Sequence, residues 1–349
     1  MAYTTIDKST LHFNTVAWTG TASSPVNVTG YGFQPDIIWN KYRAGAGDHQ
    51  FYDAVRGATK MIIPNSTAAE STNANGVTAF ISDGFTAGSD INVNGGNSVA
   101  WGWKANGQGS SNTDGSITST VSANTTAGFS ICKWTGTGSA GTIGHGLGAV
   151  PSMIIFKNLD GSSSRMWAVY HKGAYVSASD PNILYLNTSN AQADDTNVLG
   201  TSVTLSSSVF SVGDYAGSNY SGENIIAYVF AEKKGFSKFM SWSGNGSSTN
   251  GTFLYTGFKP AFFIYKVTSG AGGWGMLDNK RDTINPVDNT LSAHSNSAEA
   301  ADHDVDFLSN GIKIRSAGGD INASGSSYIG MAFAEAPLVG SNNVPCTAR

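Results

Sequence analysis

The sequence predicts an all-β protein made of three tandem homologous β-sandwich domains of jelly-roll type. Three observations predict it: a motif that recurs three times, strands with two-residue periodicity in each copy, and a composition of small polar and aromatic residues. The motif joins a Trp-Thr-Gly or Trp-Ser-Gly tripeptide, a proline and an apolar run that ends in lysine. Its three copies are Trp18, Pro35 and Lys41; Trp134, Pro151 and Lys157; and Trp242, Pro260 and Lys266.

The spacing of the motif sets the predicted domain boundaries. All three landmarks shift by 116 residues from copy one to copy two, and by 108 or 109 from copy two to copy three. A period near 110 residues is too long for a solenoid unit and suits a whole domain. The predicted domains are residues 1–106, residues 107–235 with a linker at the start, and residues 236–349 with a C-terminal tail.

Each copy is predicted to close with a strand in which large and small side chains alternate, at residues 99–103, 226–230 and 329–333. A period of two places all the large side chains on one face, which we predict to be core. The opposite face is small and nearly uncharged. We expect a loop, a second sheet or a neighbouring subunit to cover it. If Trp101 lies in the core of a separate domain, Trp101→Asp should unfold the first domain alone.

The apolar runs at residues 36–41, 153–157 and 262–267 predict central strands buried on both faces. A proline precedes each run, where a missing N–H costs no ladder bond. Residues 82–84 and 309–311 read as tight turns. Residues 105–128 read as an inter-domain linker, and the short boundary at residues 232–238 predicts close docking of the second and third domains. The helix formers at residues 297–302 are too few for a stable helix.

Composition excludes several classes of protein. Charged residues are 13% of the 349, below the roughly 25% usual for soluble domains, whereas 8 Trp, 13 Tyr and 17 Phe supply the aromatic residues that a core needs. The net charge is −4 and the Lys and Arg residues are scattered, so we expect no nucleic acid partner. Residues 1–10 lack the apolar core of a signal peptide, and no 18-residue apolar run predicts membrane insertion.

The titratable residues predict no catalytic, cofactor-binding or metal-binding site, so no cofactor is expected and any receptor-binding residues are unknown. The alternating carboxylates of Asp302, Asp304 and Asp306 could bind a hard cation or form a solvated loop, and the missing loop glycine favours the second. His145 lies in a glycine-rich turn without a nucleophile motif, so a flexible turn is the simpler interpretation. Cys132 is expected to be a buried thiol and Cys346 a tail thiol.

One acid–base pair recurs in two copies. Asp53 and Arg56 have counterparts in Asp278 and Arg281, whereas copy two has residues 170–173 and no acid there. We interpret the pair as a local ion pair that ties a loop. If Asp53 is partly exposed, Asp53→Ala should cost about 0 to 1 kcal/mol.

Several stretches of the sequence match a known module. They are residues 32–41, 52–60, 82–85 and 99–105 in copy one; residues 127–131, 133–138, 143–148, 151, 167–172 and 184–187 in copy two; and residues 333–337 and 344–349 at the C-terminus. In these stretches the sequence resembles a module of virion structural and fibre-like proteins of tailed bacteriophages, many of them marine. The resemblance covers nearly the whole chain. Copy three departs most, because Lys259 and Ala261 replace the Gln34 and Asp36 of copy one.

This resemblance implies a non-enzymatic virion component, associated with the tail or its fibres and contributing to host attachment. The alternative is a capsid decoration or head-fibre protein, and a polysaccharide-cleaving tailspike or a lectin-like sugar binder ranks below both. The implied partners are other virion proteins, further copies of the chain with a trimer favoured, and a host surface glycan or protein. The implied location is the tail or outer surface of the phage particle, after synthesis in the host cytoplasm.

Overall fold

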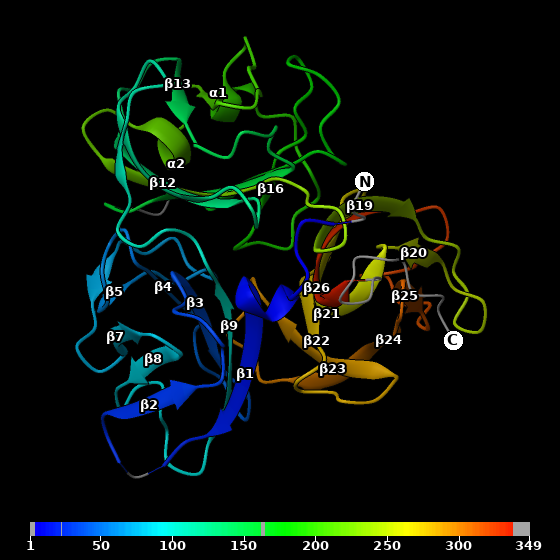
Figure 1. The fold of residues 1–349 in the computed structure, drawn as a ribbon. Helices are drawn as coiled ribbons and strands as arrows, with labels where there is room; N and C mark the ends of the chain where they lie inside the picture. Colours follow the sequence, from blue (N-terminus) through cyan, green and yellow to red (C-terminus); the bar gives the residue numbers. More distant parts are fainter. Residues whose placement is uncertain (1–3, 22, 162–164, 338–349) are drawn as a thin grey trace.

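The computed structural model describes residues 4–21, 23–161 and 165–337, and nearly all of their regular structure is β-strand. The all-β prediction is therefore confirmed. Figure 1 shows three lobes around one centre, which we call segment 1 (residues 13–103), segment 2 (residues 110–230) and segment 3 (residues 237–337). Residues 338–349, which include Cys346 of the predicted C-terminal tail, lie outside the described residues. Among the helices of the described part, none has the length and apolarity that a membrane crossing needs.

Segment 1 follows the short 3-10 helix η1 (Ser9–Leu11) and forms three sheets. The largest has the order β1-β9-β3-β4, a second has the order β2-β8-β7, and β5 pairs with β6. The turn predicted at residues 82–84 joins β7 to β8. The strands are β1 (Phe13–Thr19), β2 (Val26–Thr29), β3 (Ile37–Tyr42), β4 (Gln50–Asp53), β5 (Lys60–Met61), β6 (Ser71–Thr72), β7 (Val77–Ile81), β8 (Gly84–Ala87) and β9 (Asn97–Trp103).

Segment 2 has a seven-stranded sheet in the order β10-β11-β12-β18-β14-β15-β16, with the pair β13-β17 beside it. Residues 105–128, predicted to be a linker, instead supply β10 and β11 to this sheet. The elements are β10 (Ser110–Asn112), β11 (Ser119–Asn124), β12 (Phe129–Thr135), β13 (Gly141–Gly144), β14 (Met153–Asn158), β15 (Ala168–His171), β16 (Leu184–Tyr185), α1 (Thr196–Leu199), β17 (Val209–Val212), α2 (Ala216–Asn219) and β18 (Asn224–Phe230).

Segment 3 forms one eight-stranded sheet, in the order β19-β26-β21-β22-β23-β24-β25-β20, that is nearly closed like a barrel. Pro260, predicted to lie just before a strand, lies inside β21 at a register shift, which is where a sheet tolerates proline. The strands are β19 (Ser237–Ser243), β20 (Phe253–Tyr255), β21 (Phe258–Val267), β22 (Trp274–Asp278), β23 (Val287–Ser292), β24 (Ala300–Leu308), β25 (Gly311–Ile314) and β26 (Ser327–Pro337).

The three segments share one arrangement of four antiparallel strands. The order β1-β9-β3-β4 of segment 1 recurs as β12-β18-β14-β15 and as β19-β26-β21-β22. The register also recurs, because Trp103 pairs with Phe13 and Ile37 as Phe230 pairs with Phe129 and Met153. The sequence repeat is therefore a repeat of strand order and register. The division into three jelly-roll domains stays a prediction.

The large side chains of the three closing strands β9, β18 and β26 meet in one shared core. The rings of Trp103, Phe230 and Phe333 lie 5.7 to 6.3 Å apart in all three pairings. Residues at the two levels below them, Trp101 and Val99 in β9 for example, belong to the same buried cluster. The predicted core face is thus a core between segments, which no segment completes alone.

The small faces of the closing strands point the other way, into a second core within each of the first two segments. Ala100 packs with Val28 and Phe85 of the β2-β8-β7 sheet, and Ala227 packs with Ile143 and Phe210 of the β13-β17 pair. Of the three coverings expected from sequence, the second sheet is the one found. The small faces are therefore covered within the chain.

Candidate functional site

The boundary between segments 1 and 2 buries a carboxylate that accepts hydrogen bonds from both segments. Asp53 ends β4, and the backbone N–H of Arg56 donates to its Oδ1 at 2.9 Å, which closes the turn. The Arg56 guanidinium lies 2.5 Å from Oδ2, and the side chains of both residues are 0% exposed. From segment 2, the Tyr228 hydroxyl donates to the same oxygen at 2.7 Å. Burial, together with the Asp53 charge, raises the pKa of Tyr228 well above its ordinary value.

The boundary between segments 1 and 3 repeats this tie with a different donor. The Trp101 indole N–H of segment 1 donates to Oδ2 of Asp278 at 3.0 Å, and Arg281 lies 2.6 Å from the same oxygen. Arg281 also pairs with Glu299 at 2.7 Å, and Glu299 in turn pairs with Arg43 of segment 1 at 2.6 Å. The pair predicted from sequence is confirmed as a local ion pair. The prediction that the pair is partly exposed is wrong, because both carboxylates contact a neighbouring segment and are buried.

The third boundary, between segments 3 and 2, uses histidine in place of the acid. His171 ends β15, where segments 1 and 3 have their aspartates. The Gly173 N–H donates to its Nδ1 at 3.0 Å, so Nε2 carries the proton and donates to the Gly330 carbonyl of segment 3 at 3.3 Å. Burial, reinforced by the charge of Lys172, lowers the pKa of His171 to about 3. The neutral imidazole of His171 thus needs no counterion of the kind that Arg56 and Arg281 provide for the two aspartates.

A second ring four residues earlier reinforces each boundary. Trp167 donates to the Ser66 carbonyl of segment 1 at 3.0 Å, and Trp274 donates to the Tyr185 carbonyl of segment 2 at 2.9 Å. In segment 1 the equivalent residue is His49, whose Nδ1 accepts from the Trp39 indole; its Nε2 therefore donates to the Ser292 carbonyl of segment 3 at 3.0 Å. Each segment thus inserts one ring N–H into its neighbour, and the three contacts run in one direction around the centre.

The lysines of the repeated motif are buried as well. Lys41, Lys157 and Lys266 are each 0% exposed and donate to backbone carbonyls, among them Asn296 of segment 3 at 3.4 Å from Lys41 and Thr67 of segment 1 at 3.0 Å from Lys157. Burial lowers the pKa of each to about 8. These ammonium groups fix backbone near the boundaries.

One family model spans all three segments. Residues 8–337 match a domain of unknown function, DUF7483. The chain belongs to the DUF7483 family. A comparison with the curated proteins found no match. The DUF7483 match treats the three segments as one unit, as the shared core does.

The remaining residues singled out in the DUF7483 sequence lie apart from one another. Asp302, Asp304 and Asp306 lie along β24, where Asp306 pairs with Arg315 at 2.6 Å and Asp302 contacts His303. Within the described ranges, no group of three His, Cys, Asp or Glu side chains is placed to hold a metal ion.

His145 and Cys132 are both buried in segment 2. His145 accepts from the Leu147 N–H at 3.2 Å and contacts the Ser206 carbonyl at 3.2 Å, and burial lowers its pKa. It therefore fixes the turn predicted to be flexible. Cys132 is a free thiol, as expected, and burial raises its pKa to about 12.

Sequence reasoning missed one asparagine in each copy of the DUF7483 repeat. Asn92, Asn219 and Asn322 each accept, through Oδ1, from the backbone N–H of the residue that follows the Trp-Thr-Gly or Trp-Ser-Gly motif. Their spacings, 127 and 103 residues, differ from the period of the motif. A search at a fixed period therefore misses them, although all three bind the backbone at the same point after the motif.

Proposed function

We propose that this chain is a non-enzymatic structural component of a tailed-phage virion, associated with the tail or its fibres and contributing to host attachment. One observation carries the proposal: the buried polar groups at the boundaries tie three equivalent segments into one body. Arg56 and Arg281 each form a buried ion pair with an aspartate at these boundaries. Such a body suits a part that must keep its shape while it bears load.

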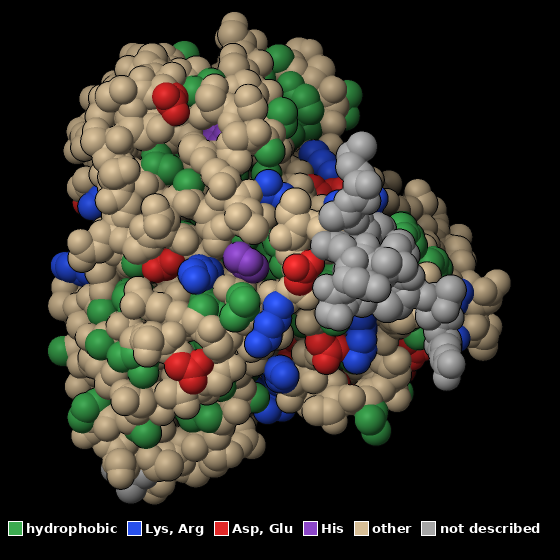
Figure 2. Space-filling view, viewed as in Figure 1, with side chains coloured by type: hydrophobic (Ala, Val, Ile, Leu, Met, Phe, Trp, Pro, Cys, Tyr) green, Lys and Arg blue, Asp and Glu red, His purple; other side chains and the backbone are tan. Residues whose placement is uncertain are grey.

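The surface supports the same role. On the face in Figure 2, uncharged side chains and backbone make up most of the surface, and many of the charged side chains lie where the lobes meet. Pairs such as Lys172 with Glu232 (2.6 Å) and Lys238 with Glu232 (2.8 Å) lie at the junction of segments 2 and 3. On this face, the outer parts of the lobes thus offer mostly uncharged surface for contact with partners.

Immunogold labelling of intact particles with an antibody to the chain tests the proposal. We expect gold at the distal tail. Gold spread over the head would instead assign the chain to capsid decoration or a head fibre, and particles without gold would overturn the virion role.

Self-association is part of the proposal, with a trimer as the first expectation and the outer surfaces of the lobes as the contacts. The small strand faces first considered for subunit packing are buried inside the chain. Light scattering of the purified 36.3 kDa chain measures the copy number. A mass of 36.3 kDa at micromolar concentration would contradict the trimer.

A further inference from the structure

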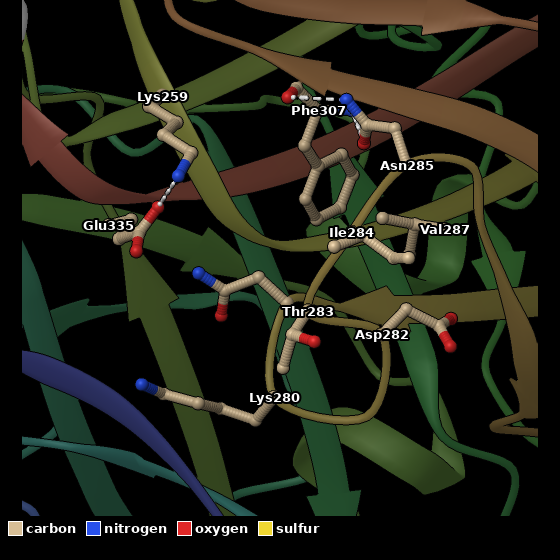
Figure 3. A pocket seen from close by; sticks show the side chains of 10 residues that line it. Lys259, Lys280, Asp282, Thr283, Ile284, Asn285, Val287, Phe307 and Glu335 are labelled. Atoms are coloured by element: carbon tan, nitrogen blue, oxygen red, sulfur yellow. Dashed lines mark hydrogen bonds and ion pairs between the residues drawn. The ribbon is translucent and has the colours of Figure 1, made fainter.

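Segment 3 has an open hollow of about 400 Å³ that joins polar and apolar walls. It lies between the start of β21, the loop at residues 279–287, β24 and the end of β26 (Figure 3). A volume of this size is in the range of small-molecule sites. Neither Asp278 nor Arg281 lines it, although Asn279 and Lys280 of its lining lie between these two residues in the chain.

Three polar side chains form one wall. The Lys259 ammonium lies 2.6 Å from Oε2 of Glu335, and the two reach across from neighbouring strands (Figure 3). Oδ1 of Asn279 is buried and accepts no hydrogen bond from the described residues. A buried acceptor without a donor destabilises the fold unless a ligand or water donates a hydrogen bond to it. Ammonium, carboxylate and amide together can both donate and accept.

The other wall is apolar and held in place. Phe307 and Val287 are buried, whereas Ile284 is 80% exposed at the rim. Asn285 clamps the loop to β24, since its Nδ2 donates to the Phe307 carbonyl at 3.2 Å and its Oδ1 accepts from the Phe307 N–H at 2.9 Å. The aromatic wall therefore keeps its position relative to the polar one.

Segment 1 shows that the fold does not require these polar groups. When positions are counted along the chain from the equivalent strand pairings, Gln34, Ala54 and Ala105 correspond to Lys259, Asn279 and Glu335. The frame is the same, because the Ala54 N–H donates to the Asp36 carbonyl at 2.9 Å as the Asn279 N–H donates to the Ala261 carbonyl at 3.0 Å.

In segment 1, a side chain of the protein itself satisfies the backbone at the position that corresponds to the hollow. There the Asp36 carboxylate accepts from the Ala105 N–H at 2.7 Å, whereas segment 3 has only the methyl group of Ala261 at the equivalent position. The departures of copy three from copy one thus coincide with the hollow.

We propose that this hollow binds one sugar residue of a host surface glycan, an inference that rests on the proposed role in host attachment. A pyranose presents vicinal hydroxyls along its edge and C–H groups on its face. The hydroxyls match the ammonium, carboxylate and amide of Lys259, Glu335 and Asn279. The C–H face packs on Phe307 and Ile284.

Saturation-transfer NMR of the full chain with a panel of methyl glycosides tests the site. The panel contains the glucoside, galactoside, mannoside, N-acetylglucosaminide and galacturonide. We expect transfer to at least one of them. Lys259→Gln with Asn279→Ala, which installs the residues of segment 1, should weaken the affinity about tenfold or more for the lost hydrogen bonds. Gln34→Ala is the matched control and should leave affinity unchanged.

No transfer to any glycoside, or transfer that the double variant leaves unchanged while its thermal unfolding matches the parent, would overturn the site. The two proposals fail separately. Sugar binding by a chain that is absent from particles would leave the site standing and overturn the virion role. Gold on particles together with no sugar binding would leave the virion role standing and overturn the site.

Discussion

The hydroxyl of Tyr228 donates to Oδ2 of Asp53 across 2.7 Å, although the two residues are 175 positions apart in the chain. Trp101 and Asp278 form the equivalent contact at 3.0 Å, across 177 positions. One position of the closing strand thus supplies the donor in both cases, through chemically different groups. Because both carboxylates are buried, separating the segments would leave each with one donor fewer.

Asp53→Ala should destabilise the chain by about 3 to 5 kcal/mol, because it leaves the buried Arg56 guanidinium without its main counterion. This replaces the value near 0 to 1 kcal/mol expected for a partly exposed pair. Urea unfolding measures the difference. Asp306→Ala is the control, since its partner Arg315 is 43% exposed, and should cost about 0 to 1 kcal/mol. Equal effects for the two variants would contradict the buried tie.

Trp101→Asp should unfold all three segments together, because its ring lies in the core that they share. The expectation that only the first domain unfolds treated that core as local. Limited proteolysis with mass spectrometry distinguishes the two outcomes. A protected fragment that contains residues 110–337 would show that segments 2 and 3 stand without segment 1.

Acid should weaken the fold through His49 and His171. Burial lowers the pKa of each to about 3 in the folded chain, whereas the unfolded side chains titrate near 6.5. The unfolded state alone binds these protons between those values. Stability is therefore full above pH 6.5 and falls by about 1.4 kcal/mol per pH unit and histidine down to pH 3.

Urea midpoints measured between pH 4 and 7 test this dependence. In the His171→Gln variant, the slope of stability against pH should decrease by the contribution of one of the two histidines. An unchanged slope would mean that His171 does not stay neutral in the folded chain.

Alkaline pH should have the opposite effect through the motif lysines. Burial lowers the pKa of Lys41, Lys157 and Lys266 to about 8, below the unfolded value near 10.4. The unfolded state binds more protons in this window, so stability should rise from pH 8 to about 10. Above pH 10 buried tyrosines such as Tyr228, whose pKa burial raises, should reverse the trend. Thermal unfolding at pH 7.5 and 9.5 checks this, and Lys266→Met should reduce the gain by about a third.

The local features of the fold could be predicted from the sequence. The closing strands, the buried central strands, and the turns at residues 82–84 and 309–311 all depend on side-chain periodicity or turn chemistry, which are properties of short stretches. The linker prediction at residues 105–128 failed because β10 and β11 are rich in Ser, Thr and Asn and carry little apolar signal. Their place in the sheet comes from pairing with β12.

By itself, the sequence determined that the chain is all-β, that it repeats, and which face of each closing strand carries the large side chains. Only the tertiary structure decided what that face packs against and which group of a neighbouring segment forms a hydrogen bond with Asp53, Asp278 and His171. The physical reason is the distance along the chain over which each feature is determined. Periodicity is set within a few residues, whereas a hydrogen bond between segments depends on how whole sheets dock. The partner is a Tyr hydroxyl for Asp53, a Trp indole for Asp278 and a backbone carbonyl for His171.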